Sequence, residues 1–153
     1  MGNDNRYNKS KVFDPFAFPE ATPEQRAVIA ELAEELDATR KAALAEVPGL
    51  TMTKIYNLVA WLRGRTDGSA PEGEALNHRA QSARAGIVAR LHEQIDAAVA
   101  AAYGWGQDWE KGDLPPSEIV ARLVALNAAR AAEEAAGHIR WLRPDYQIPR
   151  FGG

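Results

Sequence analysis

The 153-residue chain contains no cysteine. Disulfide bonds, a catalytic thiolate and cysteine-ligated zinc are therefore excluded. No stretch approaches the roughly 18–20 consecutive apolar residues that span a bilayer. The first residues, Met1-Gly-Asn-Asp-Asn-Arg-Tyr, contain no hydrophobic run typical of a secretory signal. We therefore expect a cytoplasmic protein.

The chain also lacks an overall excess of basic residues, since its net charge is −3. This balance argues against a freestanding nucleic-acid binder, because phosphate neutralisation needs clustered Lys and Arg. The charge is unevenly distributed: residues 1–12 and 138–153 each carry +2, which leaves −7 for the middle. Any contact with DNA should therefore involve the two ends, although solvated tails would show the same pattern.

Recognisable catalytic motifs are missing as well. The three histidines, His78, His92 and His138, do not form an H-E-x-x-H or similar metal-ligand spacing. The sequence contains no G-x-G-x-x-G motif and no Walker loop. Acidic residues such as Glu133 and Glu134 lie in alanine-rich segments, where a solvated helix face or ion pairing is the ordinary interpretation. The sequence thus predicts no catalytic, cofactor-binding or metal-binding residue.

Hydrophobic residues make up 46% of the whole chain, and many of them lie in alanine-rich segments. Because alanine is the strongest helix former, we predict a mainly α fold. The expected architecture is an open four-helix bundle flanked by extended aromatic and basic segments. Residues 1–21 would form an extended strap, residues 22–137 the helical domain and residues 138–153 an extended tail. The expected helices cover about 23–46, 53–62, 74–102 and 116–136.

Capping residues and apolar periodicity set these helix boundaries. Thr22-Pro23-Glu24-Gln25 supplies a capping box with proline at the first helical position. Thr51 or Thr53 would cap the second helix, and Ser117 or Asp113 the fourth. Gly64, Gly104 and Gly137 are expected to end the second, third and fourth helices. Three apolar stripes predict the buried helix faces: Ile29, Leu32, Leu36 and Ala43; Ile55, Leu58, Val59 and Leu62; and Leu76, Ala80, Ala83, Ile87, Leu91, Ile95, Ala98, Val99 and Ala102. Ile119, Leu123 and Leu126, widened by Val120 and Val124, mark the fourth.

The two ends combine aromatic residues with proline, which fixes φ and removes a backbone donor. We predict an extended strap at Phe13-Asp-Pro-Phe-Ala-Phe-Pro and a second extended segment from His138 to Phe151. The aromatic side chains of these segments need an apolar surface, either on this domain or on a neighbouring one.

An ordered set of motifs extends over nearly the whole chain. It comprises Arg6-Tyr-Asn-Lys9 before the Phe13 segment, Leu50-Thr-Met-Thr-Lys-Ile-Tyr-Asn57, Leu91-His-Glu-Gln-Ile-Asp-Ala-Ala-Val-Ala-Ala-Ala-Tyr-Gly-Trp105, Glu118-Ile-Val-Ala-Arg-Leu-Val-Ala-Leu-Asn-Ala-Ala-Arg-Ala-Ala-Glu-Glu134 and Ile139-Arg-Trp-Leu-Arg-Pro-Asp-Tyr-Gln147. Together these resemble the C-terminal helical region of MmeI-like adenine-specific DNA methyltransferases of restriction–modification systems. Ala17 departs from the family's usual proline, and the loop from Gly106 to Gly112 is longer than usual.

The resemblance implies a non-catalytic segment that follows the target-recognition domain of a longer enzyme. That parent enzyme would transfer a methyl group from S-adenosylmethionine to the adenine amino group. The family's cofactor loop, its Asn-Pro-Pro-Tyr loop and its nuclease motif do not occur here, so we expect no enzymatic activity and no cofactor in this chain. The expected partners are the methyltransferase and target-recognition domains, with DNA bound through that assembly.

Two groups of residues would serve this role. The candidates for DNA-backbone contacts are Arg6, Lys9, Arg140 and Arg143, although ion pairing with the acidic body would occupy the same arginines. The candidates for docking on the neighbouring domains are Phe13, Phe16, Phe18, Trp141 and Tyr146. The alternative function is a standalone helical protein-interaction module unrelated to DNA, with Phe13, Phe16, Phe18, Trp105 and Trp109 as its binding patch.

Overall fold

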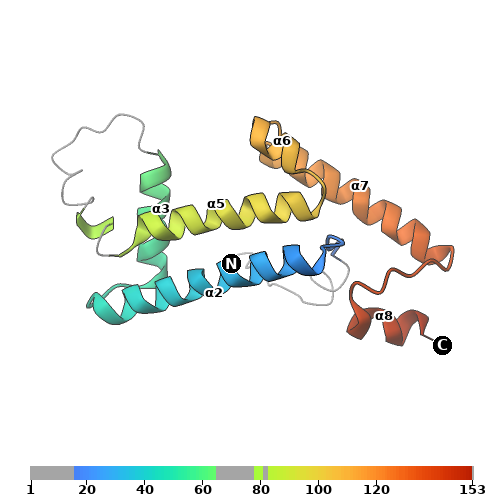
Figure 1. Ribbon diagram of the computed structural model, residues 1–153, viewed down its shortest axis with the longest axis horizontal. Helices are drawn as coiled ribbons and strands as arrows, with labels where there is room; N and C mark the ends of the chain where they lie inside the picture. Colours follow the sequence, from blue (N-terminus) through green and yellow to red (C-terminus); the bar gives the residue numbers. More distant parts are fainter. Residues whose placement is uncertain (1–15, 65–77, 81–82, 153) are drawn as a thin grey trace, which may run out of the picture. The chain divides into compact units, whose positions relative to one another are not determined.

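A computed structural model describes residues 16–64, 78–80 and 83–152 of the chain. The described residues form helices and turns and contain no strand, which confirms the mainly α class. The helices are α2 (Pro23–Glu46), α3 (Met52–Gly64), α5 (Ala85–Ala102), α6 (Gly106–Lys111), α7 (Pro116–Ala135) and α8 (Pro144–Phe151) (Figure 1). None of these helices is both long and apolar enough to cross a membrane.

The chain divides into two compact units, one formed by residues 21–107 and the other by residues 1–20 together with 108–153. The sequence predicts a single helical domain over 22–137, in which the glycine- and tryptophan-rich loop around Asp108 joins two helices of the bundle. The first unit contains α2, α3 and α5, and the second contains α7 and α8. The predicted open bundle of four helices combines helices of both units and stays a prediction.

Helix α2 has the predicted bounds and the predicted N-terminal cap. Gln25 N donates to Thr22 Oγ1 at 3.2 Å, and Thr22 N donates to Gln25 Oε1 at 3.0 Å. This reciprocal pair satisfies two of the backbone donors that a helix start leaves unpaired. Leu36 and Ala43 of the predicted stripe are buried.

The turn into α3 relies on a glycine in the left-handed region. Gly49 has a φ of +73°, a conformation that glycine adopts without a Cβ clash. Thr51 then caps α3, since its Oγ1 accepts from Lys54 N at 3.3 Å. The prediction that Gly64 forms a left-handed cap is wrong: Gly64 is the last residue of α3, and its φ is not positive.

The third predicted helix, over 74–102, begins later than expected. Its first residues lie partly outside the described ones, and α5 starts at Ala85 after Arg84, whose φ is +54°. This left-handed residue restarts the helical phase, so Val88 is buried while Ile87 is 40% exposed. The unbroken apolar stripe through Ile87 is therefore wrong, because periodicity alone does not register a break in the backbone.

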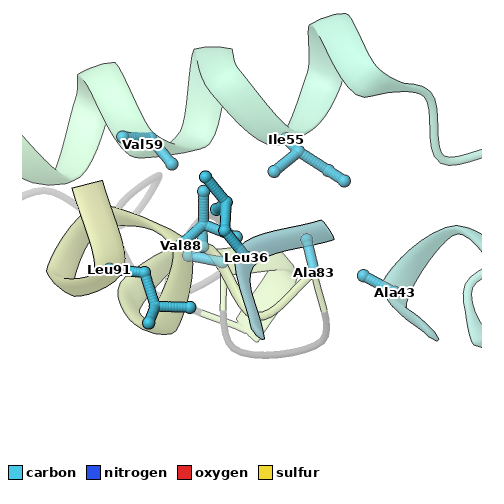
Figure 2. Packing of buried hydrophobic residues seen from close by; sticks show 9 residues of the cluster. Leu36, Ala43, Ile55, Val59, Ala83, Val88 and Leu91 are labelled. Carbon is cyan, nitrogen blue, oxygen red and sulfur yellow. The ribbon is translucent and has the colours of Figure 1, made fainter. Parts of the chain in front are cut away.

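The core of the first unit lies between α2, α3 and α5. Figure 2 shows Ile55 and Val59 of α3 facing Leu36 of α2 and Val88 of α5, and all four side chains are buried. Helices α2 and α5 run antiparallel, as Gln25 Nε2 donates to Ala101 O at one end (3.4 Å) and Arg84 binds Glu46 at the other (2.6 Å) (Figure 1). Tyr56 and Trp61, which the predicted stripe of α3 does not include, are partly buried and pack against this core.

Glycine ends α5 and α7 as predicted. Gly104 (φ +79°) follows α5, where Trp105 N donates to Ala100 O at 2.8 Å. Gly137 (φ +87°) follows α7, where His138 N donates to Glu133 O at 2.9 Å. In each case the residue after the glycine donates to a carbonyl in the last turn of the helix, which is the Schellman arrangement.

The start of α7 differs from the prediction. Its N-cap is Pro115 and carries no side-chain cap, so neither Ser117 nor Asp113 caps the helix. Pro116 instead stands at the first helical position, where the missing N–H costs nothing. The short helix α6, in the glycine- and tryptophan-rich loop, was not predicted.

The C-terminal tail is not extended throughout, as the sequence analysis expected, because residues Pro144–Phe151 form α8. Pro144 at the first helical position and Asp145 in the first turn are a helix-start signal like that of α2. The interior Pro149 obscures this signal, although α8, with eight residues, loses only the one backbone hydrogen bond that proline cannot donate.

Candidate docking and nucleic-acid interface

Arg140 stands at the centre of an ion-pair cluster in the second unit. Its Nε donates to Glu133 Oε2 at 2.7 Å and its Nη2 donates to Glu133 Oε1 at 3.0 Å, which makes a bidentate pair. Its Nη1 donates to Glu20 Oε1 at 2.7 Å. Gly137 places Arg140 here, because the Schellman turn reverses the chain after α7 and brings Arg140 back beside Glu133.

The pairing fixes the charge of all three groups. The hydrogen bonds from Arg140 hold the pKa of Glu133 and that of Glu20 below their usual range. The two carboxylates in turn raise the pKa of Arg140, with Glu133 as the largest cause. Arg140 is therefore fully ionised, but its donors already bind carboxylates, as the ion-pairing alternative anticipated.

Arg143 lies deeper in the same unit, with a side chain only 14% exposed. Its Nη2 lies 3.5 Å from Glu134 Oε1, and its Nη1 is buried with no hydrogen-bond partner among the described residues. Gln147, which is 2% exposed, donates from Nε2 to Glu134 Oε1 at 2.9 Å and accepts from Arg143 N at 2.9 Å. Gln147 thus fixes α8 to the end of α7, a role that sequence reasoning missed because a lone Gln in a tail carries no pattern.

The aromatic candidates of the second unit fall into different environments. The guanidinium Cζ atoms of Arg143 and Arg150 each lie 4.9 Å from the ring centroid of the partly buried Tyr146, so both cations contact its π system. Trp141 is 44% exposed, with a φ of +51°. Phe16 and Phe18 pack edge-to-face with centroids 5.1 Å apart, and Phe16 is 38% exposed.

Three of the predicted site residues, Arg6, Lys9 and Phe13, lie outside the described residues. The structure brings Arg140 and Arg143 together around the end of α7, with Tyr146 beside Arg143. Of the alternative binding patch, Trp105 stacks on Tyr103 at 4.5 Å, and both Trp105 and Trp109 are half-buried.

An exposed apolar face on α7 was not predicted. Val120 and Val124, which the sequence analysis assigned to the core side, are 59% and 65% exposed. None of the 20 residues of α7 is buried, and Ile119, Leu123 and Leu126 are only half-buried. The 3.6-residue period correctly identified an apolar face, but periodicity does not show whether the chain itself covers that face.

Within the part of the chain that the structure describes, no three histidine or acidic side chains are placed to hold a metal ion. Comparison with known proteins gives no further assignment: no family model, no curated protein and no solved structure matches this chain.

Proposed function

We propose that this chain is a non-catalytic helical domain of a DNA adenine methyltransferase of the restriction–modification type. In this role it docks on the methyltransferase and target-recognition domains, which supply S-adenosylmethionine binding and all the chemistry. The proposal rests on the ordered motifs that resemble the C-terminal region of MmeI-like enzymes. The observation that carries the docking role is the uncovered apolar face of α7.

Two valines, Val120 and Val124, expose the apolar face of α7. Val120 and Val124 lie one turn apart and point to the same side. The same unit also exposes Trp141 (44%), Ile148 (56%) and Phe151 (37%). Exposed apolar patches are typical of protein interaction sites, and the Val120–Val124 row of α7 is the apolar surface on which this proposal relies. Among the described residues of this unit, the buried hydrophobic ones are Ala17 and Leu114, and a partner surface would supply further apolar contacts.

The ion pairs of Arg140 affect whether this arginine can bind a DNA phosphate. A phosphate that bound Arg140 would have to displace Glu133 and Glu20, both of which lie within 3.0 Å. The geometry therefore favours docking over direct phosphate binding for Arg140. Arg6 and Lys9 remain the backbone-contact candidates in this proposal, and such contacts position a duplex without reading its sequence.

Binding to a truncated MmeI-like enzyme tests the docking role. The partner is the methyltransferase and target-recognition portion of such an enzyme, expressed without its own C-terminal helical region. We expect sedimentation velocity to show a complex with this chain. The variant Val120→Asp/Val124→Asp should abolish the complex, because it places two charges in the apolar contact.

The matched control is Ala125→Asp on the same helix, since Ala125 is exposed and lies outside the Val120–Val124 row. This control should bind normally. A complex that survives the double substitution would contradict docking through α7. Tight binding to an unrelated protein, with no affinity for the truncated enzyme, would instead support the standalone interaction module.

A further inference from the structure

A pocket of about 630 Å³ opens on the first unit, at the connection between α2 and α3. This volume falls within the range of about 300–1,000 Å³ that is typical of small-molecule sites. The site lies within residues 21–107 and shares no residue with the ion-pair cluster or the α7 face.

The apolar residues that line the pocket are held in place by the core of the first unit. Leu50, Leu58 and Trp61 line it, and all three also pack against the buried core of the first unit. The connection is fixed by the positive φ of Gly49 and by Lys54 Nζ, which donates to Gly49 O at 2.7 Å. The contacts that hold α2 and α3 together therefore also position the apolar lining of this hollow.

The rim of the pocket is cationic. Lys54 and Arg79 line it together with His78, and no Asp or Glu is among the described residues around it. Ala80, buried in the core, holds the neighbouring Arg79 at this position. Arg79 forms no ion pair with any described residue, and Glu46, which precedes the lining residue Val47, is bound by Arg84 at 2.6 Å.

The described residues of this rim are positively charged, whereas the middle of the chain has a net negative charge. The middle of the sequence carries −7, yet the described residues that border this apolar hollow carry two formal positive charges and no formal negative charge. Such a combination favours a ligand with a flat apolar body and a single anionic group, because the body removes apolar surface from water while the anion meets the two cations.

We propose that this pocket binds a small aromatic carboxylate. The ring system lies against Leu50, Leu58 and Trp61, and the carboxylate accepts hydrogen bonds from Lys54 and Arg79. The proposal is independent of the docking role of α7, because the two surfaces share no residue.

The test uses 2-naphthoate as the probe and the neutral 2-naphthamide as its isosteric control. Each is titrated into the full chain and followed by ¹H–¹⁵N NMR, with the indole N–H of Trp61 as the reporter. By the binding energy per atom usual for ligands of this size, we expect 2-naphthoate to saturate with a Kd of about 1 mM or lower. The amide should bind roughly fivefold or more weakly, as it lacks the charge-assisted bonds.

Substitutions then locate the anion. Arg79→Met should reduce 2-naphthoate affinity to that of the amide, and it removes no hydrogen bond or ion pair between described residues. Lys54→Met should have a similar effect, although it also removes the bond to Gly49. Arg63→Met, on the same helix as Lys54 but outside the pocket, should leave binding unchanged. Equal affinity for acid and amide, shift changes that avoid Trp61, or an unaltered Kd in Arg79→Met would each overturn the proposal.

Discussion

The hydroxyl of Tyr56 connects α2, α3 and α5 of the first unit. Tyr56 Oη lies 2.8 Å from His92 Nε2 of α5 and accepts from Arg40 Nη1 of α2 at 3.0 Å. Arg40 also lies 3.6 Å from Asp37 Oδ1, and its Nε is buried without a partner among the described residues. One phenolic oxygen therefore satisfies polar groups on two neighbouring helices, in a setting that is partly buried.

We predict that Tyr56→Phe lowers the free energy of unfolding by about 1–2 kcal/mol. The substitution keeps the ring but leaves a partly buried imidazole and guanidinium without their shared partner. Urea denaturation followed by circular dichroism measures the change. A double-mutant cycle with His92→Ala should give less than the sum of the two single effects, and full additivity would show that the bond contributes nothing.

Arg140 gives a second residue-scale prediction, based on the pKa of Glu133. That pKa lies below 4.5 in the folded chain because of the hydrogen bonds from Arg140, so we expect Arg140→Met to raise it toward 4.5. A ¹³C NMR titration of the glutamate and aspartate side-chain carboxyl groups measures it. The pKa of Asp37, which Lys41 lowers, serves as the internal reference and should not move.

The lowered pKa also sets the pH window for stability. A carboxylate whose folded pKa is depressed contributes stability above its unfolded pKa and loses this contribution as the pH falls through the folded value. The difference in unfolding free energy between wild type and Arg140→Met should therefore be present at pH 7 and disappear at pH values well below 4.5. A difference that does not depend on pH would mean that Arg140 stabilises the fold through packing alone.

At the scale of elements, two glycines at the opposite ends of α5 differ in whether their backbone conformation requires glycine. Gly104 ends α5 with a φ of +79°, whereas Gly86 in the first turn has no positive φ, and an added Cβ meets nothing within 4 Å at either position. We predict that Gly104→Ala destabilises the chain by about 1–2 kcal/mol through backbone strain alone.

Gly86→Ala is the matched control and should stabilise the chain by about 0.4–1 kcal/mol, because alanine reduces the entropy of the unfolded chain. Thermal and urea unfolding of both variants compare the two effects. If Gly104→Ala proved as stable as Gly86→Ala, the Schellman turn after α5 would not need a left-handed residue.

Local signals in the sequence determined much of the helical structure. The capping box at Thr22, the Thr51 cap and the glycines at 104 and 137 predicted the bounds of α2 and the ends of α5 and α7 correctly. These signals work because each depends on backbone groups within a few residues. The break at Arg84 was not predictable, since a left-handed arginine leaves no trace in apolar periodicity. The same holds for Gln147, whose role depends on Glu134 across a turn.

Less of the candidate site than of the helical structure could be predicted from the sequence. The basic and aromatic residues at the ends were identified, but their partners were not. Glu133 and Glu134 looked like a solvated face, because only the turn at Gly137 brings Arg140 and Arg143 back toward them. Val120 and Val124 were assigned to a core for lack of any sequence signal that separates a covered apolar face from an uncovered one.

For the whole molecule, the distribution of buried apolar residues is uneven. The buried cluster of Leu36, Ile55, Val59, Val88 and Leu91 belongs to the first unit. The second unit has α7 without a buried residue and several exposed aromatic and aliphatic side chains. Since apolar burial is the main stabilising force in folding, a unit of this composition gains most from an external apolar surface.

Methyl transfer to DNA is the most direct test of the docking role. Transfer from tritiated S-adenosylmethionine to duplex DNA is measured with the truncated MmeI-like enzyme alone, with this chain alone and with both together. We predict activity well above that of the truncated enzyme only in the mixture, and loss of the gain with Val120→Asp/Val124→Asp. Methyl transfer by this chain alone, or no gain in the mixture, would contradict a non-catalytic domain that supports a methyltransferase.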